Sequence, residues 1–220
     1  MCKYLGPSDS CNEMTIFREL SQVGKDAILD KHNELRRRVA KGEQAGQPPA
    51  ANMRKLVWNE ELEKISQRWA DQCIFGHDPV RSKLNGTSVG QNAYWGGNTA
   101  EGSEADIKNA VANPTQAWFN EVTNPGFASE NINPFVFNAN GLQNGHYSQV
   151  VWAKTEELGC GVVYYKGEVY YETIIVCNYA QSGNYVGAVM YEEGDACDDT
   201  SQAGCEDGLW ARTAPSPDVP

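Results

Sequence analysis

Seven cysteines are spread over this chain of 220 residues, and their pairing limits the folds open to it. They lack the paired Cys-x-x-Cys spacing that holds a zinc ribbon. Seven cysteines are also too many for a typical cytosolic protein of this length, because thiols are kept reduced in that compartment. The cysteines therefore favour an exported, disulfide-bonded protein. Because the number is odd, at least one thiol has no partner within the chain.

The beginning of the sequence is open to two interpretations. No hydrophobic signal segment precedes Cys2, so the chain is either a mature exported protein with a start methionine or a cytosolic protein. The cysteines favour the first. The sequon Asn85-Gly86-Thr87 agrees with export, because N-glycans are carried by secreted proteins. We expect a secreted, extracellular protein that carries a glycan at Asn85.

The charge of the chain excludes two classes of partner. The formal net charge is −11, whereas binding of nucleic acid or of anionic lipid headgroups requires clustered lysine and arginine. No apolar run approaches the length of a membrane span. We therefore expect no nucleic-acid partner and no transmembrane segment. The length suits one domain with tails.

Three segments have the apolar spacing of amphipathic helices: residues 21–41, 59–73 and 113–122. Asn59 is the predicted N-cap of the second helix, and a proline falls in the first turn of the third. His32 lies in the middle of the apolar stripe of the first helix, with no acidic or histidine neighbour on that face. We interpret it as a buried structural histidine rather than a ligand.

Two runs rich in β-branched residues, 161–165 and 169–179, flank a Lys-Gly turn and predict a β-hairpin. Cys160 and Cys177 lie at the outer start of each arm, where a cross-strand disulfide requires them. The order of helices followed by strands predicts an α+β domain, in which helices cover an antiparallel sheet.

The chain divides into three parts, of which the first lacks clear periodicity. We interpret residues 1–20 as a strap held by a disulfide, residues 21–191 as the folded domain, and residues 192–220 as an acidic, mobile tail with a small disulfide loop. Residues 81–112 are rich in glycine, asparagine and serine and are expected to form long surface connections.

His146 follows a glycine and precedes the apolar run Val-Val-Trp, which is typical of the start of a buried strand. Such a histidine lies either at the floor of a cleft or in the core, and the local residues favour neither. His77 also follows a glycine and, by itself, is expected to cap a helix end in a loop. Glu121 lies one position off the apolar stripe of its helix, where a solvated or capping role is usual.

Three motifs resemble a known family. Residues 145–152 read GHYSQVVW and resemble the GHYTQ-VW signature of the CAP superfamily, which comprises cysteine-rich secretory, antigen-five and class-one pathogenesis-related proteins. Residues 177–184 read CNYAQSGN and are similar to the second signature, CNYGPSGN. Residues 32–36 read HNELR and match the HNxxR of the first helix.

The resemblance covers about residues 25–191, and the spellings at 48–59 and 90–92 are most similar to arthropod antigen-five or venom-allergen proteins. It implies a three-layer α-β-α sandwich, with a central antiparallel sheet and a large cleft. The family cleft carries two histidines and two acidic residues.

The motifs assign these cleft positions to residues of this chain. The family's histidines match His77 and His146, and one acidic residue matches Glu121. The other acidic residue falls on Gln91, which cannot take up or release a proton. Acid-base catalysis by two carboxylates is therefore not available. The resemblance implies at most a weak site for zinc or another divalent metal, formed by the two imidazoles with Glu121 or water.

The resemblance also implies the disulfide pairs. They are Cys11–Cys73, Cys160–Cys177 and Cys197–Cys205. Cys2 is left unpaired, with its antigen-five partner upstream of this chain, or is linked to the tail.

Two classes of function follow from the resemblance. The first is a non-enzymatic protein of venom, saliva or defence that binds a sterol, a fatty-acid-like lipid or an extracellular protein. Its lipid-binding loop would carry Phe127, Phe135 and Phe137 as an exposed apolar patch, unless these rings pack the loop onto the domain. The alternative is a metal-dependent hydrolase or protease that uses His77, His146 and Glu121. The sequence leaves the oligomeric state open.

Overall fold

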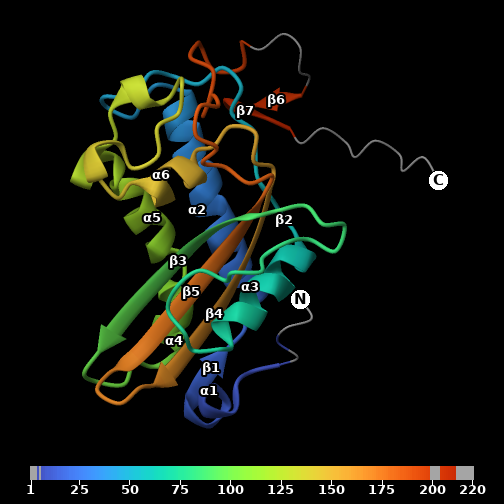
Figure 1. Cartoon of the computed structure of the whole chain (residues 1–220), viewed down its shortest axis with the longest axis vertical. Coiled ribbons are helices and arrows are strands. Elements are labelled where there is room, and N and C mark those ends of the chain that lie inside the picture. Colours follow the sequence, from blue (N-terminus) through green and yellow to red (C-terminus); the bar gives the residue numbers. More distant parts are fainter. Residues whose placement is uncertain (1–3, 5, 199–203, 212–220) are drawn as a thin grey trace, which may run out of the picture.

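The computed structural model describes residues 4, 6–198 and 204–211, and they form an α+β sandwich of three layers (Figure 1). A helix lies in front of the central sheet in that view, and most other helices lie behind it or above it. The elements are α1 (Asp9–Met14), β1 (Thr15–Arg18), α2 (Gln22–Ala40), β2 (Val57–Trp58), α3 (Glu60–Ala70), β3 (Gly90–Asn98), α4 (Glu104–Ala110), α5 (Asn113–Asn120), three short turns of helix (Val122–Gly126, Ser129–Asn131 and Ala139–Gly141), α6 (Gly145–Val150), β4 (Glu157–Lys166), β5 (Tyr171–Ala180), β6 (Cys205–Glu206) and β7 (Leu209–Trp210).

The central sheet has the strand order β1-β4-β5-β3, and these strands are antiparallel. The short strand β2 adds to β4 in parallel orientation. In the β4–β5 hairpin Cys160 lies directly opposite Cys177, and the two form a disulfide. The hairpin and its cross-strand disulfide are therefore confirmed.

One face of the sheet is covered by α3. The backbone of α3 comes close to β4 because two residues of that strand, Gly159 and Gly161, have no side chain. A Cβ at Gly159 would lie 2.3 Å from the amide nitrogen of Glu63, and a Cβ at Gly161 would lie 2.4 Å from the Cα of Gln67. No real Cβ tolerates such distances. The close packing of α3 on β4 therefore requires glycine at both positions.

The main hydrophobic core lies on the other face of the sheet, under α2, α5 and α6. It contains Ile28 and Leu35 of α2, Trp118 of α5, Val150 of α6 and Val162 of β4. Side chains alternate along a strand, so residues of β4 two apart reach this core while their neighbours face α3. Both faces are buried, which explains why β4 reads as a nearly continuous apolar run.

The three predicted helices are confirmed. α2 begins after Ser21, whose hydroxyl accepts a hydrogen bond from the amide of Gly24. α3 begins after Asn59, whose side chain accepts from the amide of Leu62. α5 has Pro114 in its first turn. Within the described residues, no helix is long and apolar enough to cross a membrane.

Two predictions of local structure were wrong. The Val-Val-Trp run at 150–152 does not start a strand: Val150 ends the helix α6 and Val151 is its C-cap, because tertiary packing overrides the β-propensity of the run. Within residues 81–112, residues 90–98 form the strand β3 and residues 104–110 form the helix α4 rather than surface connections. The glycines and asparagines of β3 have low strand propensity, but pairing with β5 along the whole strand satisfies its backbone.

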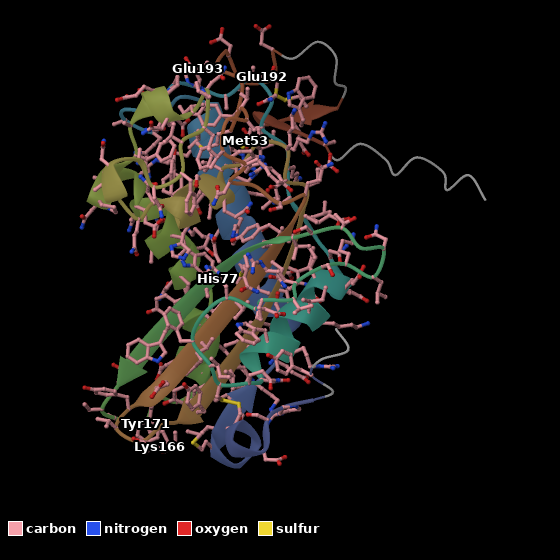
Figure 2. The ribbon with its side chains drawn as sticks, viewed as in Figure 1. Met53, His77, Lys166, Tyr171, Glu192 and Glu193 are labelled. Atoms are coloured by element: carbon pink, nitrogen blue, oxygen red, sulfur yellow. A yellow bond between two sulfur atoms is a disulfide. The ribbon has the colours of Figure 1, made fainter. Side chains whose placement is uncertain are left out.

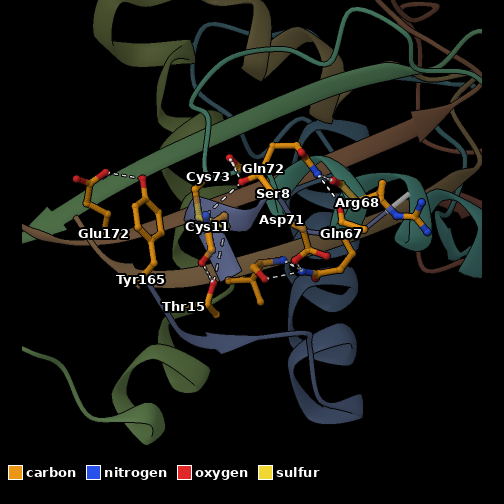
Figure 3. Close-up of a disulfide and its surroundings, with 12 residues drawn as sticks. Ser8, Cys11, Thr15, Gln67, Arg68, Asp71, Gln72, Cys73, Tyr165 and Glu172 are labelled. Atoms are coloured by element: carbon orange, nitrogen blue, oxygen red, sulfur yellow. Dashed lines mark hydrogen bonds between the residues drawn. A yellow bond between two sulfur atoms is a disulfide. The ribbon is translucent and has the colours of Figure 1, made fainter. Parts of the chain in front are cut away.

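Both ends of the chain are more structured than the sequence predicts. Residues 9–18 form α1 and the edge strand β1, and the Cys11–Cys73 disulfide holds α1 to the loop after α3 (Figure 3). In the C-terminal segment a third disulfide joins Cys197 and Cys205, Leu209 belongs to the main core, and Trp210 is buried with its indole nitrogen donating to the carbonyl of Ala51. The prediction of a mobile tail is therefore wrong for this part. Cys2 lies outside the described residues.

The interpretation of His32 as a structural histidine is confirmed. The ring is fully buried; its Nδ1 lies 2.8 Å from the carbonyl oxygen of Ile28, and its Nε2 lies 2.9 Å from the hydroxyl of Tyr179. Because a carbonyl only accepts, Nδ1 carries the proton and Nε2 accepts from Tyr179. Burial lowers the pKa of His32 to about 4.

We expect this histidine to make stability depend on pH. Between pH 6.5 and about 4 the unfolded chain binds a proton at His32 and the folded chain does not, so stability falls as pH falls through this window. The loss attributable to His32 is about 3 kcal/mol. Urea unfolding at pH 7 and pH 4.5 tests it, with His32→Gln as the comparison. A smaller loss in the variant is expected, and an equal loss in both would contradict this assignment.

Candidate functional site

A cavity of about 190 Å³ lies at the free edge of strand β3. It is lined by His77, Gln91, Asn92, Phe137, Asn138, Gln143, Gly145, His146 and Asn184. Gln91 and Asn92 are consecutive in β3 and so point to opposite faces of the sheet. Both reach the cavity, which therefore extends around the strand edge and joins the loop after α3 to the start of α6. Figure 2 shows His77 beside the upper part of this strand.

His146 is held at the beginning of α6 by Glu121. One carboxylate oxygen lies 2.6 Å from Nδ1 of the His146 ring. The other accepts hydrogen bonds from the backbone amides of His146 and Tyr147, at 3.0 Å each. Glu121 thus caps α6 and orients the imidazole at the same time. The ring of Trp118 stacks on His146, with 6.0 Å between ring centroids.

His77 is held in the loop after α3 by Gln91. The side-chain oxygen of Gln91 lies 3.1 Å from Nδ1 of His77 and accepts a second hydrogen bond, of 2.9 Å, from the amide of Asp78. Burial lowers the pKa of His77; the hydrogen bond with Gln91 opposes this effect, and the charges of Arg81 and His146 add to it. The neutral ring donates from Nδ1, because the oxygen of Gln91 only accepts.

Gln91 is held in turn by Asn178 in the neighbouring strand β5. The Gln91 amide nitrogen donates to the side-chain oxygen of Asn178 at 2.9 Å, and Asn178 is fully buried. The side-chain nitrogen of Asn178 has no partner within the described part of the chain. The amide at position 91 is thus fixed in one orientation, with its oxygen toward His77.

The structure brings His77, His146 and Gln91 together around one cavity, and Glu121 holds His146 without lining the cavity itself. Each imidazole has an orienting partner at Nδ1, and the described residues offer no hydrogen-bond partner to either Nε2. Metal-binding histidines have this arrangement. Glu121, however, uses both oxygens on α6, and the described residues contain no group of three histidine, cysteine, aspartate or glutamate side chains that could hold an ion. The side chains fit a two-imidazole site and not the three-ligand site.

The expected patch of exposed phenylalanines does not form. Phe127 and Phe135 are buried in the main core, with 5% and 1% of their surface exposed, and only Phe137 is exposed, at 45%. Phe135 packs edge-on against Trp152, with 5.2 Å between ring centroids. The sequence pattern could not separate these roles, because the loop alternates irregularly and its rings turn inward to pack it on the domain.

A second cavity, which none of the sequence motifs indicates, lies on the face of the sheet under α4. It has a volume of about 260 Å³ and lies between β3, β5 and the α4–α5 segment. Its apolar lining includes Tyr94, Ile107, Pro114 and Ile175. The signal in the sequence is the pair Gly96-Gly97, which leaves two consecutive strand positions without side chains.

The sequon lies in an exposed turn. Asn85 is exposed, and its side-chain oxygen accepts a 3.0 Å hydrogen bond from the amide of Thr87. Gly86 adopts a φ of +84°, which glycine tolerates without strain. The geometry leaves room for a glycan.

Known proteins are similar to this chain in sequence and in fold. Residues 29–179 match the model of the cysteine-rich secretory protein family, CAP. The chain is 38% identical to a venom allergen 5 of Microctonus hyperodae over 198 residues, which cover 87% of this chain and 81% of the relative. It is 40% identical to a venom allergen 3 of Solenopsis invicta over 204 residues, which cover 87% and 82%.

Solved structures agree with these relatives. The chain superposes on BmVAL-1 with a TM-score of 0.76 and 25% identity, covering 89% of this chain and 97% of the other. It superposes on NaASP2, in a crystal structure described as containing Zn²⁺, with a TM-score of 0.71 and 28% identity, covering 93% and 100%.

Proposed function

Because this chain belongs to the cysteine-rich secretory protein (CAP) family, we propose that it is a secreted, non-enzymatic binding protein whose ligand is a fatty-acid-like lipid. The observation that carries the proposal is the cavity under α4, called the α4 groove below. Secretion is supported by the three disulfides, which persist in oxidising compartments. The venom allergens among its relatives suggest a setting in venom, saliva or defence.

The α4 groove has the lining that a hydrocarbon chain requires. Ile175 is buried at its floor, and Ile107 and Ala110 line it from the helix. Gly96 leaves room for the ring of Tyr94, which covers the strand there and adds an aromatic surface to the groove. Its volume of about 260 Å³ falls below the roughly 300–1,000 Å³ of cavities for drug-sized molecules. A slender acyl chain therefore fits better than a rigid sterol.

Polar groups lie among these apolar residues. Asn98, Asn113 and Thr173 line the same groove and can hydrogen-bond a carboxyl head. No residue of α4 is buried, and Figure 1 shows this helix behind the lower half of the sheet. A helix that inserts no side chain into the core can shift without unfolding the domain, which gives a ligand a route of entry.

A substitution on α4 tests this proposal. Ile107→Glu places a charge in the groove and should weaken binding of a fluorescent fatty acid about tenfold or more, or about 1.4 kcal/mol. The melting temperature should be nearly unchanged, because Ile107 is only partly buried. Asn109→Glu is the matched control: the residue is exposed on the same helix and does not line the groove. Equal binding by both variants and the parent would refute the α4 groove as the site.

A divalent metal on His77 and His146 is a second candidate. The two free Nε2 atoms support it, and so does the zinc in the NaASP2 structure. When bound, zinc would act as a Lewis acid or as a structural tie. In this chain Gln91 and Glu121 would hold the rings in place. With two protein ligands, the site would be weak.

The hydrolase alternative has less support. Gln91 supplies no ionisable group, and Glu121 is engaged by two backbone amides and one imidazole. General acid-base work requires a group that is free to exchange a proton. A glycan at Asn85 and an extracellular protein target remain part of the proposal, supported by the exposed turn and by the relatives.

A further inference from the structure

The cavity at the edge of β3 has an unusual lining for a metal site. Five of its nine lining residues are carboxamides: Gln91, Asn92, Asn138, Gln143 and Asn184. The rest are the two histidines, Phe137 and Gly145, and none of the nine is an aspartate, glutamate, lysine or arginine. A cation would find no free carboxylate here, and an anion would find no fixed positive charge.

Three of these carboxamides are rigid. Gln91 is bonded to His77, Asp78 and Asn178, as described above. Asn184 accepts a 2.7 Å hydrogen bond from the hydroxyl of Ser148 and donates one of 2.8 Å to the carbonyl of Gly145. Asn92 donates to the carbonyl of His146. The walls of the cavity are thus fixed before any ligand binds, and such preorganisation reduces the entropic cost of binding.

Other polar groups that line the cavity lack partners within the described chain. The Nε2 atoms of His77 and His146 have none, and Gln143 is exposed with no hydrogen bond. The side-chain oxygen of Asn138 is buried and has no hydrogen-bond partner. A buried acceptor without a donor is costly, at roughly 1–3 kcal/mol, so the Asn138 side chain would recover this energy by turning its oxygen toward a donor on a ligand in the cavity.

One apolar surface completes the site. Phe137 is 45% exposed, and its ring lies against Gly145 so closely that a Cβ there would come within 2.6 Å of the ring. The ring is therefore fixed over the glycine, and its open side presents an apolar face at the cavity. A ligand that carries both hydroxyl groups and a flat C–H face matches this combination.

We propose that this cavity binds a neutral saccharide, with one pyranose ring between the carboxamides and the ring of Phe137. Hydroxyl groups both donate and accept hydrogen bonds, as carboxamides do, so the two are complementary without net charge. The volume of about 190 Å³ admits a small ligand of this kind. The site is separate from the α4 groove, which shares no lining residue with it, so this inference stands independently of the proposed lipid.

Saturation-transfer difference NMR on the full chain tests the inference. The probes are N-acetylglucosamine, mannose, galactose and glucose, each at about 10 mM so that millimolar affinity is detected, with EDTA present to exclude bridging metal. At least one sugar should receive saturation from the protein. Phe137→Ala and Gln143→Leu should each lower its affinity about tenfold. Both side chains are exposed, so folding should be retained.

The control is Gln22→Leu, which removes an exposed carboxamide outside the cavity and should leave sugar binding unchanged. Absence of signal from every sugar would overturn the proposal. A signal that persists in both cavity variants would also overturn it, because the sugar would then bind elsewhere.

Discussion

Replacement of Arg36 by methionine is expected to lower the free energy of unfolding by about 5 kcal/mol or more, enough to unfold a domain of ordinary stability. The guanidinium is fully buried, and its partners are backbone carbonyls. They are the carbonyl oxygens of Arg54, Val150, Trp152, Ala153 and Thr155, at 2.8 to 3.2 Å. Methionine fills similar space but removes all five donors. The carbonyls of Trp152 and Ala153 would keep only the backbone amides of Thr155 and Arg54, and those of Arg54, Val150 and Thr155 would lose their side-chain donor.

The role of Arg36 depends on its shape and charge. Five N–H groups in a fixed planar fork match five carbonyls. Four converge from the end of α6 and the segment after it, and the fifth is that of Arg54, before β2. The C-terminal end of α6 and the carbonyl oxygens together supply the negative potential around the guanidinium that a carboxylate would otherwise give. Burial lowers the pKa of Arg36 to about 9, so the side chain still carries its proton at neutral pH. Arg36 thereby joins α2 to the helix that carries His146.

Chemical denaturation of matched variants measures this role. Arg36→Lys supplies at most three donors from one nitrogen and should fall between the parent and Arg36→Met. Arg37→Met is the control: Arg37 is half-exposed and pairs with Asp207 at the surface, so its loss should cost about 1 kcal/mol or less. An Arg36→Met protein as stable as the Arg37→Met control would contradict this account of the carbonyl cluster.

The second large effect is expected at Phe135. Phe135→Ala should destabilise the fold by about 4 kcal/mol, because the ring is 1% exposed and packs between Phe127 and Trp152. The sequence alone suggests a different outcome, namely weaker lipid binding with little change in melting temperature. That expectation required an exposed ring, whereas the ring lies in the core.

Phe137→Ala is the internal control for Phe135→Ala. Phe137 is in the same loop and 45% exposed, so the substitution should cost about 1 kcal/mol or less. Thermal unfolding of the two variants in parallel distinguishes core packing from surface exposure. Equal melting temperatures would show that the loop is not packed as the structure has it.

Local sequence signals predicted the helix ends and the hairpin that depend on interactions between residues close together in the sequence. The N-cap Asn59 and the hairpin with Cys160 opposite Cys177 follow from short-range rules, and both are confirmed. The resemblance to the CAP family supplied the disulfide that joins Cys11 to Cys73, which no local rule could give, because 62 residues separate the two cysteines.

The features that the sequence did not predict depend on contacts between residues that are far apart in the sequence. β3 has poor strand propensity, and pairing with β5 alone makes it a strand. The sequence placed Glu121 in the cleft, but its capping of α6 appears only when α5 and α6 pack together. Whether Phe127 and Phe135 point inward or outward is likewise decided by tertiary packing.

Native mass spectrometry of the protein, purified from a eukaryotic host without chelator and trimmed of glycan, tests the central claim most directly. We expect a co-purifying mass in the range of fatty acids, which is reduced in Ile107→Glu and retained in Asn109→Glu. Metal would add a distinct, small mass that EDTA removes. A protein that carries no lipid and takes up none when fatty acid is added would contradict the proposed function.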